Sequence, residues 1–149
     1  MIKKIILLSL FLLTSCGYQP LYKQVTSGYE FFNLKFEGDQ NLGMRILGNL
    51  NIVENNLDDT LNSLTIKSTL LIDETSKDSK GLVQSYRSNL NIEVSIIKNQ
   101  KIIQNQSFNE SFSYNNMNTR FELLDYQKQV EEILIRKINN KIRLFLNKL

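Results

Sequence analysis

Two features of the composition limit the chemistry open to this 149-residue chain: it has one cysteine, Cys16, and no histidine. Histidine is the commonest general base near neutral pH, so a serine or cysteine nucleophile lacks its usual partner here. Carboxylates could act in pairs, and Asp58–Asp59 and Glu131–Glu132 are adjacent in the chain. Such pairs are more often solvated charges on turns and helix surfaces. We therefore expect a protein that is not an enzyme and that needs no cofactor and no metal.

The segment before Cys16 has the layout of a secretory signal. Two lysines precede the apolar run Ile5–Leu13, and two small polar residues separate that run from the cysteine. The run is too short to span a bilayer, which needs about 20 apolar residues. The sequence Leu13-Thr14-Ser15-Cys16 resembles the lipobox of bacterial lipoproteins. That resemblance implies removal of residues 1–15 and acylation of Cys16, whereas a buried or free thiol is the weaker alternative.

The charge balance and the length describe what would remain after cleavage. Loss of Lys3 and Lys4 leaves 16 of the 18 basic residues against 15 acidic residues, a net charge of +1 instead of +3. This balance does not favour nucleic acid as a partner, because nucleic-acid binding calls for a strongly basic face. The length suits one domain, which we expect at residues 29–149, behind a tether of residues 16–28.

The spacing of apolar residues predicts six elements, which are strand, helix, three strands and helix. Their expected ranges are Glu30–Glu37, Leu42–Val53, Leu64–Ile72, Tyr86–Ile96, Ile102–Tyr114 and a final helix from Thr119 to Leu149. Asp73–Lys80 is expected to be an exposed loop, and Lys98–Lys101 a hairpin turn. The predicted fold is α+β, with a four-stranded, mostly antiparallel sheet covered by two helices in the order β-α-β-β-β-α.

The final helix has the clearest pattern. Thr119 and Glu122 have the spacing of a capping box at its start. Its apolar stripe is predicted to contain Val130, Leu134, Ile138, Ile142, Phe145 and Leu149. The predicted sheet would be buried against this stripe.

Four basic residues are candidates for contact with the phosphates of anionic lipids. Lys67 and Arg87 lie on the polar faces of predicted strands, and Arg136 and Lys141 lie on the final helix. Cations near a helix C-terminus also offset the helix dipole, by about 0.3–1 kcal/mol each. A solvated helix face is therefore the simpler interpretation of the helical pair.

The residues Cys16–Tyr22 resemble the mature N-terminus of lipoproteins from the outer-membrane lipopolysaccharide-assembly complex, Cys-Gly-(aromatic)-x-Pro-Leu-Tyr. The matching positions are Cys16, Gly17, Tyr18, Pro20, Leu21 and Tyr22. In that family the lipoprotein plugs the lumen of a large β-barrel, helps the barrel to fold and aids passage of lipopolysaccharide to the outer leaflet. The resemblance implies the same partner, direct contact with lipopolysaccharide as a possibility, and a body that faces the periplasm or the lumen.

Two further inferences concern placement. Gly17, rather than an aspartate, follows the cysteine, and by the sorting rule of such lipoproteins this favours the outer membrane. A barrel lumen is polar, which suits strand faces rich in Asn, Gln, Ser and Lys. The alternative function is an outer-membrane lipoprotein that binds or senses a small apolar ligand between sheet and helices. That alternative predicts a cavity lined by residues such as Phe36, Ile92 and Ile138.

Overall fold

The computed structural model describes residues 28–149. The predicted signal, Cys16 and the Cys16–Tyr22 motif lie outside the described residues. The elements are β1 Tyr29–Phe31, β2 Leu34–Gly38, α2 Gln40–Gly48, β3 Ile52–Glu54, β4 Ser63–Lys77, β5 Val83–Lys98, β6 Lys101–Asn115 and α3 Arg120–Leu146.

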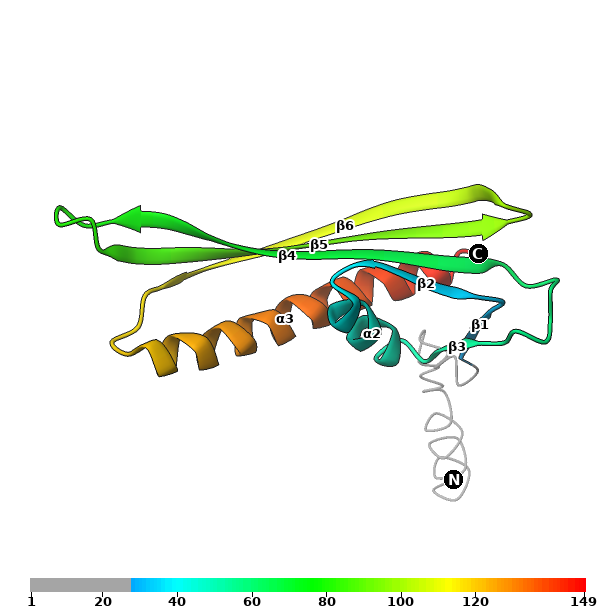
Figure 1. The fold of residues 1–149 in the computed structure, drawn as a ribbon, viewed down its shortest axis with the longest axis horizontal. Helices are drawn as coiled ribbons and strands as arrows, with labels where there is room; N and C mark the ends of the chain where they lie inside the picture. The colour runs from blue at the N-terminus through cyan, green and yellow to red at the C-terminus, as the bar shows by residue number, and fades with distance from the viewer. Residues whose placement is uncertain (1–27) are drawn as a thin grey trace, which may run out of the picture.

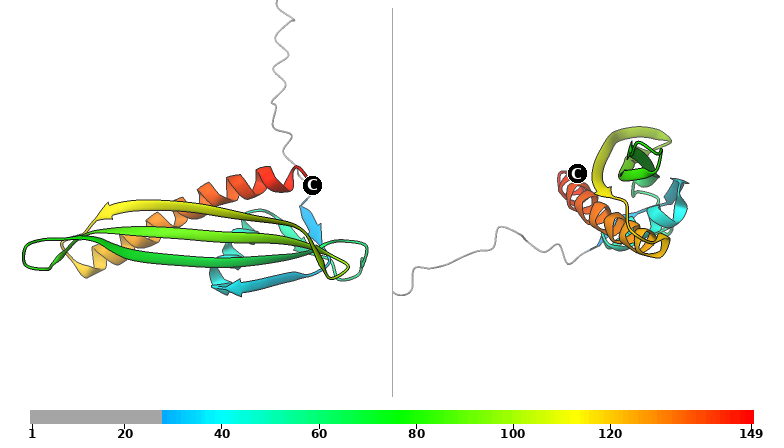
Figure 2. Two further views of the ribbon diagram at one scale, coloured as in Figure 1. Left: turned by 90° about the horizontal axis from the view of Figure 1, so that it is seen from above. Right: turned by 90° about the vertical axis from the view of Figure 1, so that its left-hand side faces the viewer.

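The fold is α+β, as predicted, and has two layers (Figure 1). The main sheet has the order β2-β4-β5-β6, in which β2 is parallel to β4 and the other neighbours are antiparallel. Helices α2 and α3 lie on the same face of this sheet, as the end-on view in Figure 2 shows. Strands β1 and β3 form a separate parallel pair at the end of the molecule that also holds the C-terminus.

Alternation along the long strands decides which face is buried. Even-numbered residues of β4, β5 and β6 point toward the helices, as a strand period of two requires. The buried apolar residues on this face are Leu64, Ile66, Leu90, Ile92, Val94, Ile96, Phe108 and Tyr114. The strand predicted over Tyr86–Ile96 is confirmed and is longer at both ends, and its even-numbered apolar and aromatic residues belong to the core or pack against it.

Helix α3 begins as predicted and ends earlier. Thr119 accepts a hydrogen bond from the Glu122 N–H, and Glu122 accepts one from the Thr119 N–H, which completes the capping box. The predicted stripe is buried from Val130 to Ile142, but the helix ends at Leu146, which takes the buried place expected for Leu149. No helix within residues 28–149 combines the length and apolar character that a membrane span requires.

The expectations for the N-terminal elements are partly wrong. The strand expected over Glu30–Glu37 is two strands in different sheets, separated at Phe32 and Asn33, because Phe31 turns into the core while β2 joins β4. The helix expected to reach Val53 ends at Gly48, since Asn51 adopts a positive φ of 53° and the chain continues into β3.

The predictions for the two hairpins of the main sheet had different outcomes. Asn99 and Gln100 both have positive φ, of 49° and 63°, which is the backbone of a two-residue type I′ turn and confirms the predicted hairpin. The prediction of a loop over Asp73–Lys80 is wrong for most of that range, because β4 continues to Lys77 opposite β5. Pairs such as Asp73 opposite Arg87 favour strand structure there despite the polar composition.

Candidate functional site

The face of the sheet away from the helices is polar across three strands. Its residues form rows at matching register, of which the central two are Lys67–Glu93–Ser107 and Thr69–Asn91–Asn109. Each row combines side chains that can donate and accept hydrogen bonds. No helix of the described residues covers this face, and its central rows form a broad surface of hydroxyl, amide and a few charged groups.

A shallow depression lies in the middle of this polar face. It is lined by the two central rows together with Ile92, and its volume is about 130 Å³. Glu93 accepts a hydrogen bond from Asn105 Nδ2 at 2.8 Å, so its carboxylate is held in place from β6. Ligand pockets usually reach about 300–1,000 Å³, so the depression is small for a drug-sized molecule.

The four basic residues that were candidates for contact with anionic lipids do not meet on one surface. Lys67 and Arg87 lie on the polar sheet face, whereas Arg136 and Lys141 are on α3, which covers the opposite face. Lys141 pairs with Glu110 at 2.5 Å, and Arg87 Nε donates to Ser113 Oγ at 3.1 Å. The structure therefore gives two of these cations roles in holding the fold and assembles no common phosphate site from the four.

The space between sheet and helices is filled by side chains. Ile92 and Ile138, expected to line an apolar cavity, are 1% and 0% exposed and belong to the same core cluster. Phe36 packs against that cluster and reaches to within 2.8 Å of the position that a Cβ would take on Gly43. The depression described above lies on the other face of the sheet. This packing gives the small-ligand alternative no support.

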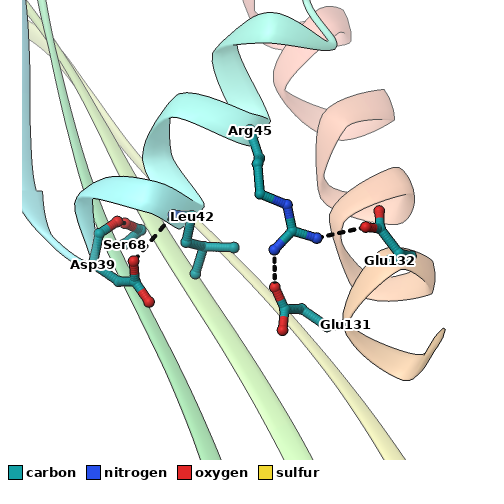
Figure 3. Close-up of polar contacts among 6 residues, drawn as sticks. All are labelled: Asp39, Leu42, Arg45, Ser68, Glu131 and Glu132. Atoms are coloured by element: carbon teal, nitrogen blue, oxygen red, sulfur yellow. Dashed lines mark hydrogen bonds and ion pairs between the residues drawn. The ribbon is translucent and has the colours of Figure 1, made fainter. Parts of the chain in front are cut away.

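An ion-pair clamp joins the two helices (Figure 3). Arg45 of α2 donates through Nη1 to Glu131 and through Nη2 to Glu132 of α3, the latter at 2.6 Å. Partial burial acts to lower the pKa of Arg45, but the hydrogen bonds to the two carboxylates outweigh it and raise the pKa above its ordinary value. Glu131 and Glu132, considered above as a catalytic pair, therefore serve the helix–helix contact.

The start of α2 is held against β4 by two hydrogen bonds of Asp39. Asp39 caps the helix by accepting from the Leu42 N–H at 3.0 Å, and the buried Ser68 hydroxyl donates to the Asp39 carbonyl at 2.5 Å (Figure 3). Gly38, with a φ of 73°, makes the turn between β2 and the helix. Neither this junction nor the Arg45 clamp was predicted from the sequence. The turn residues Gly38–Asp39 before a helical pattern were a signal for the junction.

Comparisons with known proteins give a likeness at the level of the fold. No family model matches the sequence, and no curated protein matches it significantly. A crystal structure of rare lipoprotein B from Shewanella oneidensis is 14% identical, with a TM-score of 0.55, and the match covers 78% of this chain and 95% of that one.

Two further solved structures show the same likeness of fold. Lipoprotein B from Nitrosomonas europaea, solved by NMR, is 11% identical with a TM-score of 0.57, over 85% of this chain and 88% of that one. A minor lipoprotein from Acinetobacter baumannii is 14% identical with a TM-score of 0.53, over 76% and 87% of the two chains. The chain thus has the fold of several proteins that are named lipoproteins, at identities that establish the fold alone.

Proposed function

We propose that this chain is an outer-membrane lipoprotein, anchored through acylated Cys16, that acts as plug and assembly partner of a lipopolysaccharide-translocating β-barrel. The observation that carries the proposal is the agreement between two separate parts of the chain. The N-terminal residues Cys16–Tyr22 resemble the start of mature lipopolysaccharide-assembly lipoproteins. The body, which does not include that motif, matches solved lipoproteins over most of their length.

The surface of the body supports the same proposal. A plug must present polar groups to a lumen that is itself polar. The outer sheet face offers Ser, Thr and Asn side chains in cross-strand rows, with charges such as Lys67 and Glu93 interspersed. Such a surface can exchange hydrogen bonds with water for hydrogen bonds with a lumen wall without burying unpaired charge.

Lipid attachment at Cys16 is the first test. Mass spectrometry of the protein from its native cell should find a mature chain that begins at Cys16 and carries three acyl chains. Cys16→Ala should accumulate as a full-length precursor. Ser15→Ala, which keeps a small residue before the cleavage site, serves as the matched control and should still mature. An unmodified thiol at Cys16 in the native protein would contradict the anchor.

Partner identity is the second test. Depletion of the protein should lower the amount of correctly folded lipopolysaccharide-assembly barrel, and affinity purification of the lipidated protein should recover that barrel. A depletion of an unrelated lipoprotein of the same membrane provides the control for general envelope stress. Unchanged barrel levels together with no co-purification would reject the proposed partner while leaving the anchor intact.

A further inference from the structure

The two edges of the main sheet differ in how they are protected. An edge strand presents unpaired main-chain groups that can pair with another chain, and proteins block such edges with charges, lysines, bulges or covering segments. Among the described residues, one edge is the whole of β6. The other edge is β2 and, beyond it, β4 from Thr69 onward, because β2 pairs only with Leu64–Ser68.

Strand β6 is protected by α3. Lys141 Nζ lies 3.4 Å from the main-chain carbonyl oxygen of Asn109 and donates to it. Glu110, on the inner face of the same strand, is held between Lys137 at 3.9 Å and Lys141 at 2.5 Å. An inward-pointing charge and a lysine over an edge carbonyl are two of the known devices against strand addition.

The main-chain directions in β4 follow from its contacts with the segment around β2. The N–H and C=O of one strand residue point to the same edge of the strand. Leu64 donates its N–H to the Asn33 carbonyl, and the Ser68 carbonyl accepts from the Asp39 N–H. Even-numbered residues of β4 therefore face this edge.

Past Ser68 the same edge is open. By the alternation just described, Leu70, Ile72 and Glu74 direct their main-chain groups outward, where no described strand pairs with them. The regular stretch ends at a bulge between Glu74 and Ser76. The open edge therefore spans residues 69–74, enough for a short added strand.

The side chains of the open edge are typical of a strand that is covered on both faces. Leu70–Ile72 is an unbroken apolar run, a pattern typical of strands buried on both faces. Here Leu71 is 52% exposed on the outer face and Ile72 is 44% exposed on the inner face. The nearby carboxylates already have partners, since Glu74 pairs with Lys77 at 2.9 Å and Asp73 accepts a hydrogen bond from Asn89 Nδ2 at 2.8 Å.

The geometry at the end of β2 keeps this edge open. Gly38 turns the chain away from β4 with a φ of 73°, and a Cβ there would lie 2.2 Å from the Ser68 carbonyl oxygen. Asp39 then starts α2, so the chain leaves the sheet and β2 cannot extend along β4. Within residues 28–149, no strand continues the line of β2 beyond Ser68.

We propose that residues 69–74 of β4 bind an extended segment of a partner protein, which adds to the sheet as a strand in line with β2. The occupant is a neutral segment that alternates apolar and hydroxyl side chains, because its apolar residues would cover Leu70 and Ile72 and the carboxylates at this edge already have partners. Continuity with β2, which occupies the first positions of the same edge, is the argument for a strand in this place. The inference goes beyond the proposed function, which assigns the polar outer face to the lumen wall and assigns this edge to no partner.

The test uses the purified full-length chain, labelled with ¹⁵N, and two synthetic peptides. The first alternates valine and threonine over nine residues, and the second has the same sequence with proline at its three central positions, so that it cannot pair in either strand direction. The first peptide should slow amide hydrogen exchange at Leu70, Ile72 and Glu74 at least tenfold, and the second should not. Unchanged exchange at those amides with 1 mM of the first peptide, or protection along β6 instead, would overturn the proposal.

Two protein variants locate the effect. Ile72→Pro removes one outward N–H and leaves the β4–β5 hydrogen bonds in place, so it should abolish protection by the peptide. If that variant fails to fold, Ile72→Lys places a charge at the edge and should weaken binding at least tenfold, whereas Leu82→Lys, at an exposed leucine of the β4–β5 hairpin, should not. Equal effects of the two lysine variants would reject the edge as the site.

Sedimentation of the peptide-free protein tests whether a second copy of this chain occupies the open edge. A dimer that Ile72→Pro abolishes would assign the open edge to a second copy of this chain and overturn the choice of a different partner protein. A monomer would support that choice. Because these measurements need no barrel, they can fail while the proposed function stands, and the reverse also holds.

Discussion

At the scale of single residues, polar groups near the core have sharply different surroundings. Arg45 is matched by two carboxylates of α3, and Ser68 is matched by the Asp39 carbonyl. Asn139 is 5% exposed within the apolar face of α3, and its Oδ1 has no hydrogen-bond partner among the described residues. A satisfied polar group specifies the packing, whereas an unsatisfied one costs stability. These two kinds of group predict opposite responses to substitution.

Arg45→Met should lower the free energy of unfolding by about 1 kcal/mol, because it breaks the clamp while keeping most of the side-chain stem. Arg45 and Glu132 are 43% and 59% exposed, so solvent screens the pair and a larger loss is not expected. Urea denaturation would measure the effect. Lys35→Met, which removes an ion pair with Glu37 on a more exposed surface, is the matched control and should change stability by less. Equal losses from the two variants would contradict the clamp.

Asn139→Leu should raise the free energy of unfolding by about 1–2 kcal/mol, because it replaces an unpaired buried carbonyl with an apolar group of similar size. Thermal or urea denaturation would report the change. Asn140→Leu, at the exposed neighbouring position, gains only the small difference in helix propensity and serves as the control. A loss of stability in Asn139→Leu would show that the amide has a partner beyond the described residues.

At the scale of elements, pattern and outcome agree where one face of an element is buried over most of its length. Strand β5 and helix α3 are such elements, and their periods of two and 3.6 were sufficient to identify them. Strand β3 was missed and β1 was merged with β2 into one predicted strand, because three residues carry no readable period. The continuation of β4 through Asp73 was missed because its polar composition is typical of loops, while cross-strand partners that lie far along the chain decide its structure.

The two glycines of α2 test how tertiary contact modifies helix propensity. Gly48→Ala should stabilise the protein by about 0.5–1 kcal/mol, because a Cβ there meets nothing within 4 Å and alanine favours the helix. Gly43→Ala should instead destabilise it by about 1 kcal/mol or more, because the new Cβ would lie 2.8 Å from Phe36 Cδ1 and force that ring to move. Denaturation of both variants provides the comparison, and equal stabilisation would show that Phe36 yields freely.

At the scale of the whole molecule, the fold could be predicted in outline and the site only in part. Amphipathic periods predicted the sheet and its covering helices, since burial of one face leaves few ways to pack them. The N-terminal motif predicted an anchor, which concerns residues outside the described part. The four basic residues were not brought together, because their position in space depends on which face of the sheet the helices cover. The spacing of residues along the chain does not indicate which face of the sheet the helices cover.

The shape of the body also predicts how it would lie on a membrane. Strand β1, which follows the tether, and the C-terminus lie toward the end of the molecule that holds the β5–β6 turn, while the β4–β5 hairpin lies at the other end (Figures 1 and 2). The β5–β6 turn consists of Asn99 and Gln100. Strand β5 has 16 residues, which correspond to a length of about 53 Å. The two hairpin tips should therefore lie at different heights above an anchoring bilayer.

Energy transfer from a dye on the protein to acceptors in lipid headgroups can measure these heights. With Cys16 acylated, a single new cysteine at Asn99 or Ser79 can be labelled alone, because the chain has no other thiol. On vesicles, the dye at Asn99 should transfer energy more efficiently than the dye at Ser79, since a tether of about 12 residues attaches beside the Asn99 end and spans at most about 40 Å. Equal transfer from the two positions would mean that the body lies flat on the membrane, a placement that would prevent its insertion into a barrel lumen end first.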